Sequence, residues 1–224
     1  MTDSEGLPCP SCGENTRYWI DDRLGGLPRW MLPPRREGWI ADDLDDLTDD
    51  PKWTELIDGA LVFQMHSGTV WHAATKADLN LALGAAADGD RTVLGGMTVT
   101  LDRYNRFLTD AVVIEGAVDM DATTLDPRTI PLVVEVSEDE TLHRDRTVKP
   151  QRYAASGIPF YWRVEPGEGE ARAVVVHTYE LVGATRTYTP TGVHRERLKV
   201  RRPFMVDIDL TDLRQAARGR RTSW

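Results

Sequence analysis

Short apolar runs, separated by polar and turn residues, make up most of the chain after Trp39. In TELIDGALVFQ, residues 54–64, Asp58 and Gly59 separate two such runs, which predicts a β-hairpin. The other runs have the length and the boundaries that are typical of strands. They predict strands at residues 92–101, 108–114, 131–136, 160–164, 172–181, 186–189 and 198–208.

Fewer segments carry a helical pattern. Ile40, Leu44 and Leu47 have the spacing of one face of a short amphipathic helix. Further helices are predicted at residues 71–87, at 144–156 before the cap residue Gly157, and at 211–217. Because strands outnumber helices and helices interrupt them at two places, the sequence predicts an α/β or α+β fold with a mixed sheet.

The domain organisation follows from where this pattern begins and ends. The chain has 224 residues, the length of one large domain or of a medium domain with an appendage. Residues 1–37 carry prolines and glycines without a sustained period, so we expect an N-terminal extension, either disordered or the product of a start misassigned upstream of Met31. Residues 38–214 form the predicted domain, and residues 215–224 a basic C-terminal tail.

Composition excludes several classes of protein. Apolar residues make up 41% of the chain and charged residues 28%, which is typical of globular domains. No apolar run approaches the ~20 residues that span a bilayer, and the first residues lack the pattern of a secretory signal. Two cysteines, Cys9 and Cys12, are too few to cross-link a domain of this size. We therefore expect a cytoplasmic protein without a membrane segment.

The charge distribution is uneven. The formal net charge of −9 argues against a histone-like coat for nucleic acid. Residues 195–224 nevertheless hold nine basic and four acidic residues, which leaves room for a local basic face. The tail is either a solvated end or an arm that contacts phosphates.

Three residues stand where a charge is costly or otherwise unexpected. Asp110 opens an apolar strand, and Glu135 lies inside PLVVEV, which is apolar enough to be buried on both faces. Lys149 follows in a helical segment that should pack against that strand, in a chain where arginine outnumbers lysine 23 to 4. Two carboxylates and an ammonium at one sheet edge predict a site for Mg²⁺ or Mn²⁺.

Simpler interpretations carry comparable weight at this point. Glu135 has the pattern of a structural ion pair with an arginine of the next helix, either Arg144, Arg146 or Arg152. Asp110 alone is typical of the first residue of a strand.

The sequence around these residues resembles a known family. Residues 131–166, PLVVEVSEDETLHRDRTVKPQRYAASGIPFYWRVEP, look like the signature of the bacterial Uma-two-type restriction endonucleases, of the PD-(D/E)XK nuclease superfamily. GWIADDLDDL and ELIDGALV match the family's opening, FLTDAVVI its Pro-Asp strand, and RRPFMVDIDLTDL its closing strand and helix. The resemblance covers roughly residues 38–214.

This resemblance implies a restriction-endonuclease-like fold, with a mixed central sheet flanked by helices and extra antiparallel strands. It also implies metal-dependent hydrolysis of DNA phosphodiester bonds. Asp110 and Glu135 would hold Mg²⁺ or Mn²⁺ with the carbonyl of Val136, and Lys149 would orient or deprotonate the attacking water. Glu55 is either an extra ligand or a solvated hairpin charge.

His72 matches a histidine of the family, and we expect a surface residue at a helix end. Three features depart from the family's pattern. Thr109 replaces the proline of Pro-Asp, Pro150 follows Lys149 and could redirect it, and three acids at 138–140 adjoin a site meant for phosphates. We expect no zinc at Cys9 and Cys12, because a structural site needs four ligands.

Two other functions are compatible with the residues. A nuclease fold without catalysis would bind nucleic acid or a protein partner, and a structural dimer module would use the buried ions only as ion pairs. We expect DNA as the partner and leave a homodimer open.

Overall fold

The computed structural model of the protein describes residues 33–47, 54–63, 68–168 and 173–214. Its larger sheet has six strands in the order β11-β10-β9-β8-β6-β3. All neighbouring strands are antiparallel except β8 and β9, which are parallel, so the prediction of a mixed sheet is confirmed. The strands are β3 (Arg91–Leu94), β6 (Ala111–Glu115), β8 (Leu132–Val136), β9 (Phe160–Pro166), β10 (Val174–Val182) and β11 (Thr187–His194).

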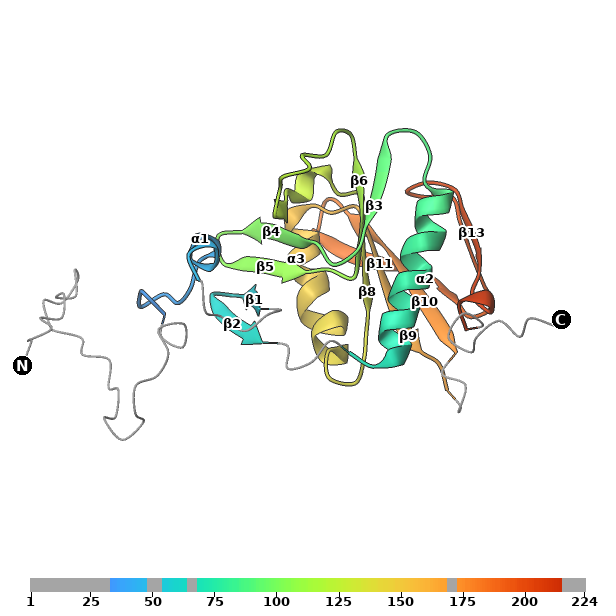
Figure 1. The fold of residues 1–224 in the computed structure, drawn as a ribbon, viewed down its shortest axis with the longest axis horizontal. Coiled ribbons are helices and arrows are strands. Elements are labelled where there is room, and N and C mark those ends of the chain that lie inside the picture. Colours follow the sequence, from blue (N-terminus) through green and yellow to red (C-terminus); the bar gives the residue numbers. More distant parts are fainter. Residues whose placement is uncertain (1–32, 48–53, 64–67, 169–172, 215–224) are drawn as a thin grey trace, which may run out of the picture.

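A second sheet of five strands, in the order β2-β1-β5-β4-β7, lies beside the first (Figure 1). It comprises β1 (Thr54–Ile57), β2 (Ala60–Phe63), β4 (Thr98–Asp102), β5 (Asn105–Leu108) and β7 (Thr124–Leu125). The predicted turn at Asp58 and Gly59 joins β1 to β2, and both residues have the positive φ that a tight hairpin turn requires. A separate antiparallel pair is formed by β12 (Arg197–Val200) and β13 (Val206–Asp209).

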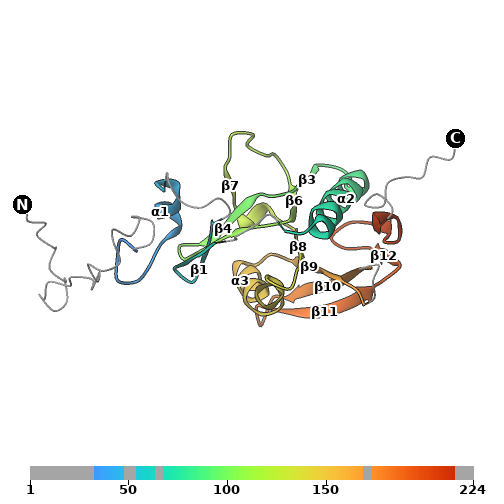
Figure 2. The same cartoon turned by 60° about the horizontal axis from the view of Figure 1, so that its bottom comes forward.

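Helices cover both faces of the larger sheet. The helices α2 (Val70–Ala86) and α3 (Lys149–Ser156) lie on either side of β8 (Figure 2). Alternate residues of β8 point to the two faces, as the pleat of a strand requires. Leu132, Val134 and Val136 pack in a core with α2 and the β12–β13 pair, whereas Val133 packs in a core with α3 and the second sheet. Glu135 therefore points toward α3.

A short helix precedes the two sheets in the chain. The short helix α1 (Ala41–Asp45), at the position predicted from the spacing of Ile40 and Leu44, lies beside a small core of Trp39, Ala41 and Leu56. No helix in the described ranges is long and apolar enough to cross a membrane. The predictions for residues 1–32 and for the tail at 215–224 lie outside the described residues.

Several strand predictions were wrong. The run at 92–101 is two strands in different sheets, β3 and β4, separated by Gly95 and by Gly96 at φ +70°. The run at 198–208 is the β12–β13 pair rather than one strand. The strands β5 and β7 were not predicted. The described part of the closing helix is one 3₁₀ turn, Asp212–Arg214.

Candidate active site

The side chain of Glu135 is buried on β8 and faces α3. Lys149, also buried, begins α3, and its Nζ lies 3.2 Å from Glu135 Oε1. The same Nζ lies 2.9 Å from Glu55 Oε1 and 3.9 Å from Asp145 Oδ1, and it donates a hydrogen bond to the carbonyl of Leu108 at 3.3 Å. One buried ammonium thus neutralises parts of three buried carboxylates.

Pro150 does not misdirect Lys149. Residues Arg144–Val148 form a π-helical turn, and the N–H of Lys149 donates to the carbonyl of Arg144. Pro150 is the second residue of α3 and directly follows this turn, inside one continuous helical run over residues 142–156. The lysine nevertheless points back to β8.

Burial and nearby charges shift the pKa values of both Glu135 and Lys149. Burial raises the pKa of Glu135 well above its usual value, and the neighbouring Asp145, Asp110 and Glu55 add to this effect against the ammonium of Lys149. Burial alone would lower the pKa of Lys149, but Glu135, Glu55 and Asp145 together raise it above its usual value. The neighbouring acids thus favour the protonated form of Lys149.

A tyrosine completes the surroundings of Glu135. The hydroxyl of Tyr153, on α3, donates to Glu135 Oε1. Its buried ring packs edge-on against Phe107 on β5, with the ring centroids 5.5 Å apart. The orientation of Glu135 is therefore determined from the α3 side by both an ammonium and a hydroxyl.

Asp110 precedes β6, the neighbour of β8. Its Oδ2 accepts a hydrogen bond of 2.8 Å from the N–H of Val136. Its Oδ1 lies 3.4 Å from His72 Nε2 and 3.4 Å from Lys76 Nζ, both on α2. Burial raises the pKa of Asp110, but the hydrogen bond and charge of His72, the charge of Lys76 and the Val136 N–H together lower it below its usual value. Asp110 is therefore ionised.

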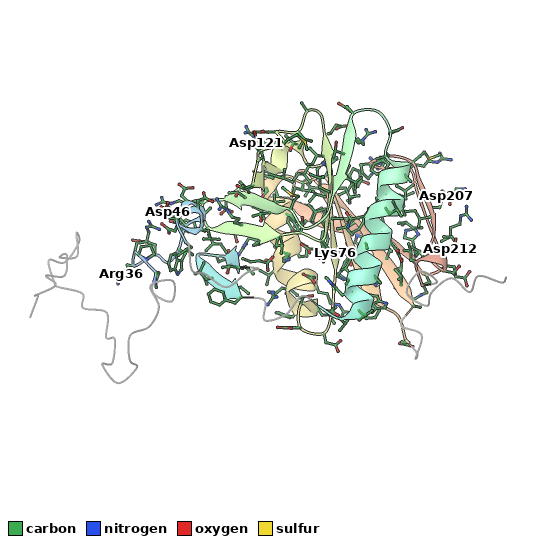
Figure 3. The ribbon with its side chains drawn as sticks, in the orientation of Figure 1. Arg36, Asp46, Lys76, Asp121, Asp207 and Asp212 are labelled. Atoms are coloured by element: carbon green, nitrogen blue, oxygen red, sulfur yellow. The ribbon has the colours of Figure 1, made fainter. Side chains whose placement is uncertain are left out.

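One cavity is lined by Asp110, Glu135 and Lys149 together. It has a volume of about 80 Å³, and its wall includes the three residues predicted for catalysis, Asp110, Glu135 and Lys149, together with Val136. Helix α2, whose residue Lys76 is labelled in Figure 3, contributes Lys76 and His72. The structure thus places Asp110, Val136, Glu135 and Lys149 at one cavity, whereas Glu55 contacts Lys149 without lining it.

Comparison with known proteins identifies the family of the chain. Residues 41–211 match the sequence model of the Uma2 family, which is described as "Putative restriction endonuclease". The chain belongs to the Uma2 family. No curated protein matches it.

A solved structure shares the fold of this Uma2 chain. It is a protein from Anabaena variabilis ATCC 29413 described as "a putative nuclease belonging to DUF820", with a TM-score of 0.60 and 15% sequence identity. The match covers 79% of the Uma2 chain and 97% of the Anabaena chain. The predicted fold is therefore confirmed.

The residues of the cavity fit a divalent cation. Around and behind it, four acidic side chains lie near two lysines and one histidine, so the acids outnumber the cations even with His72 protonated: Glu55, Asp110, Glu135 and Asp145 against His72, Lys76 and Lys149. Burial raises the pKa of two of these acids, Glu135 and Asp145. Asp145 Oδ1 and Glu55 Oε2 are buried and accept no hydrogen bond from any described residue. A hard cation with oxygen ligands would stabilise the ionised forms of these acids.

The described side chains alone do not complete a metal site. Within the described ranges, no three His, Cys, Asp or Glu side chains form a ready group of metal ligands. Asp110 and Glu135 would supply two carboxylates. The carbonyl of Val136 faces the Asp110 side, because the N–H of the same residue points there. The remaining ligands would be water or substrate oxygens, as Mg²⁺ commonly retains.

Two sequence interpretations were wrong. Glu55 is not a solvated hairpin charge, because its side chain is fully buried and contacts Lys149. His72 is not a surface histidine, because its side chain is 13% exposed and faces Asp110. Burial lowers the pKa of His72, but its hydrogen bond to Asp110 and the charge of Asp110 raise it above its usual value.

The interpretation of Glu135 as the partner of an arginine was also wrong. Arg146 pairs with Glu165 and Arg152 with Asp58, whereas Glu135 pairs with Lys149. Lys76 and Asp145 were missed as site residues. Lys76 did carry a signal, because it is one of only four lysines and lies one helical turn after His72.

Proposed function

We propose that this Uma2 chain is a metal-dependent endonuclease that hydrolyses DNA phosphodiester bonds. The observation that carries the proposal is the convergence of Asp110, Glu135 and Lys149 on one cavity, with the Lys149 ammonium 3.2 Å from Glu135 Oε1. Buried acids held beside a buried ammonium are costly for stability alone. They are common where a fold prepares a catalytic centre. The family membership and the shared nuclease fold support the same activity.

Asp110 and Glu135 would hold Mg²⁺ or Mn²⁺, together with the carbonyl of Val136. The cation, when bound, would polarise the phosphate and lower the pKa of a bound water. Lys149, 3.2 Å from Glu135 Oε1, would orient the attacking water and stabilise negative charge. Glu55 and Tyr153 would position Lys149 and Glu135 through the contacts described above.

The charged residues in the wall of the cavity would affect the binding of DNA. Glu138 and Glu140 line it, as does Arg144, so its charge is mixed. Glu138 accepts hydrogen bonds from the N–H and the hydroxyl of Thr69, which is the N-cap of α2. Its carboxylate thus also ties the loop after β8 to the start of α2. The acids make DNA binding depend on added divalent cation, because they repel phosphates.

A plasmid-nicking assay with Mg²⁺ or Mn²⁺, combined with calorimetric titration of Mn²⁺, tests the proposal. Asp110→Asn and Glu135→Gln should each abolish nicking and weaken Mn²⁺ binding at least tenfold. Glu115→Gln is the matched control, because Glu115 ends the strand that Asp110 precedes and is half exposed beside Arg91. It should leave both measurements unchanged.

Two results would contradict the proposal. Undiminished Mn²⁺ binding in both site variants would exclude the assigned ligands. Mn²⁺ binding without any nicking by the unaltered protein would favour the alternative of a nuclease fold that binds nucleic acid or a protein partner without cutting.

A further inference from the structure

Lys76 lies on α2 at the wall of the cavity, outside the set of residues assigned to catalysis (Figure 3). Its Nζ is 3.4 Å from Asp110 Oδ1, and Asp110 is the one carboxylate of the described residues within 4 Å of it. One third of the Lys76 side chain is exposed, whereas the His72 side chain, one turn earlier, is 13% exposed. Lys76 is therefore the more accessible of the two cationic groups at Asp110.

The two oxygens of Asp110 have different surroundings. Oδ2 accepts the N–H of Val136, so the backbone of β8 already uses it. Oδ1 has no such backbone bond and is the atom that both α2 side chains approach. A divalent cation bound at Asp110 would therefore meet the ammonium of Lys76 a few ångströms away. Like charges at that distance repel strongly in a partly buried site.

Lys76 has an alternative partner when DNA is present. A lysine carries a compact charge on a flexible four-carbon stem, which suits contact with a phosphate from more than one position. Because its side chain is partly exposed at the cavity wall, its ammonium reaches the mouth of the cavity without disturbing the core. The phosphate of a bound strand then replaces Asp110 as its counter-charge.

We propose that Lys76 is an internal counter-cation that occupies Asp110 in the free protein and transfers to a substrate phosphate when nucleic acid binds. This inference rests on the metal site of the proposed function. In the free protein Lys76 competes with the metal for Asp110. A bound phosphodiester draws Lys76 away, so metal and nucleic acid each tighten the binding of the other.

The test measures binding rather than activity. Lys76→Met keeps most of the apolar stem and removes the charge. Without DNA, calorimetry should show Mn²⁺ binding about three- to tenfold tighter in this variant than in the unaltered full chain. With Ca²⁺ in place of Mg²⁺, a short duplex should bind about three- to tenfold more weakly, and the slope of its log affinity against log salt should fall by about one.

Two control variants test whether the effect depends on the position of Lys76 and on its charge. Lys199 also lies 3.4 Å from an aspartate oxygen, that of Asp207 on β13, but it is 71% exposed and does not line the cavity. Asp207 is labelled in Figure 3. Lys199→Met should leave Mn²⁺ affinity within twofold of the unaltered protein. Lys76→Arg keeps the charge and should bind Mn²⁺ as weakly as the unaltered protein does.

The outcomes separate the two proposals. If the unaltered protein binds no Mn²⁺ with or without DNA, the proposed function and this inference both fail. If the unaltered protein binds Mn²⁺ and Lys76→Met binds it equally well, only the role of Lys76 fails. Unchanged affinity of Lys76→Met for the duplex would likewise exclude the transfer to phosphate. Tighter Mn²⁺ binding together with weaker duplex binding supports the inference.

Discussion

Lys149 Nζ lies 3.2 Å from Glu135 Oε1, and this contact joins the strand β8 to the helix of the crossover that connects β8 with the parallel strand β9. Lys149 directly follows the π-helical turn at Arg144–Val148, and its N–H donates to the carbonyl of Arg144. Such single wide turns are frequent at functional sites. The ion pair thus depends on how the crossover helix packs against β8.

Removal of the ammonium should destabilise the fold. Lys149→Ala leaves Glu55, Glu135 and Asp145 buried without their shared counter-charge, which we expect to lower the free energy of unfolding by about 3–5 kcal/mol. Urea denaturation at neutral pH measures this change. Adding Glu55→Gln should recover part of the loss, because one carboxylate fewer then needs compensation. The control Lys199→Ala, at an exposed ion pair, should cost less than about 1 kcal/mol.

Charge alone should not suffice at this position. Lys149→Arg keeps the positive charge, but the larger guanidinium does not fit a side-chain site that is 3% exposed. We expect the nicking rate to fall by a factor of about a hundred or more in both Lys149→Ala and Lys149→Arg, as for other lost electrostatic contacts to a transition state. Full activity of the arginine variant would show that the position of the ammonium is unimportant.

Pro150 should be neutral for the orientation of Lys149. Pro150→Ala restores an N–H directly after the π-helical turn, where the hydrogen-bond pattern of the helix is already irregular. We expect the free energy of unfolding to change by less than about 1 kcal/mol, chiefly through the unfolded state, and the nicking rate to stay within about threefold. A tenfold rise in the nicking rate would instead show that the proline holds Lys149 in an unproductive direction.

Local signals account for the elements that could be predicted. The turn at Asp58 and Gly59 and the end of α3 at Gly157, where φ is +88°, depend on residues that favour left-handed backbone. The division of residues 92–101 between two sheets could not be predicted, because it depends on pairing with distant strands. Nothing in the run itself distinguishes β3, which pairs with β6, from β4, which pairs with β5 and β7.

Part of the site could be predicted from the sequence, because a buried charge needs a counter-charge close to it. A carboxylate inside the apolar strand β8 requires a cation nearby, which indicated Glu135 and a partner in the next helix. The choice of Lys149 over the neighbouring arginines depends on the π-helical turn, for which the sequence carries no clear signal. His72 and Lys76 reach Asp110 only through the packing of α2 beside β6, more than 30 residues away.

The hydroxyl of Tyr153 should stabilise the protein through Glu135. Tyr153→Phe removes the donor to Glu135 Oε1 and keeps the ring against Phe107, so the loss reports the hydrogen bond alone. Hydrogen bonds to charged groups contribute about 1.5–3 kcal/mol, and we expect a loss in that range by urea denaturation. Tyr188→Phe removes a hydroxyl that donates to the carbonyl of Ile158 and should cost about 1 kcal/mol. Equal losses in the two variants would show that Glu135 is not a charged acceptor.

Glu165 should make stability depend on pH. Burial raises its pKa, but Arg146 and Arg163 together lower the pKa to about 2, from an ordinary value near 4.5. Because the pKa of the folded state lies below that of the unfolded state, the stabilisation is complete above pH 4.5. It is lost progressively as the pH falls from 4.5 through 2. Screening by solvent limits the contribution to about 1–2 kcal/mol at neutral pH.

Glu165→Gln should therefore lower the free energy of unfolding at pH 7, and the difference from the unaltered protein should shrink by about half at pH 3. Urea denaturation at several pH values between 3 and 7 measures both quantities. The control is Glu180→Gln, since Glu180 pairs with Arg202 at the surface, at 2.8 Å. It should change the free energy of unfolding by less than about 0.5 kcal/mol at pH 7. A difference for Glu165→Gln that stays constant from pH 7 to pH 3 would show that the arginines act on Glu165 through packing, because only the carboxylate charge is removed by acid.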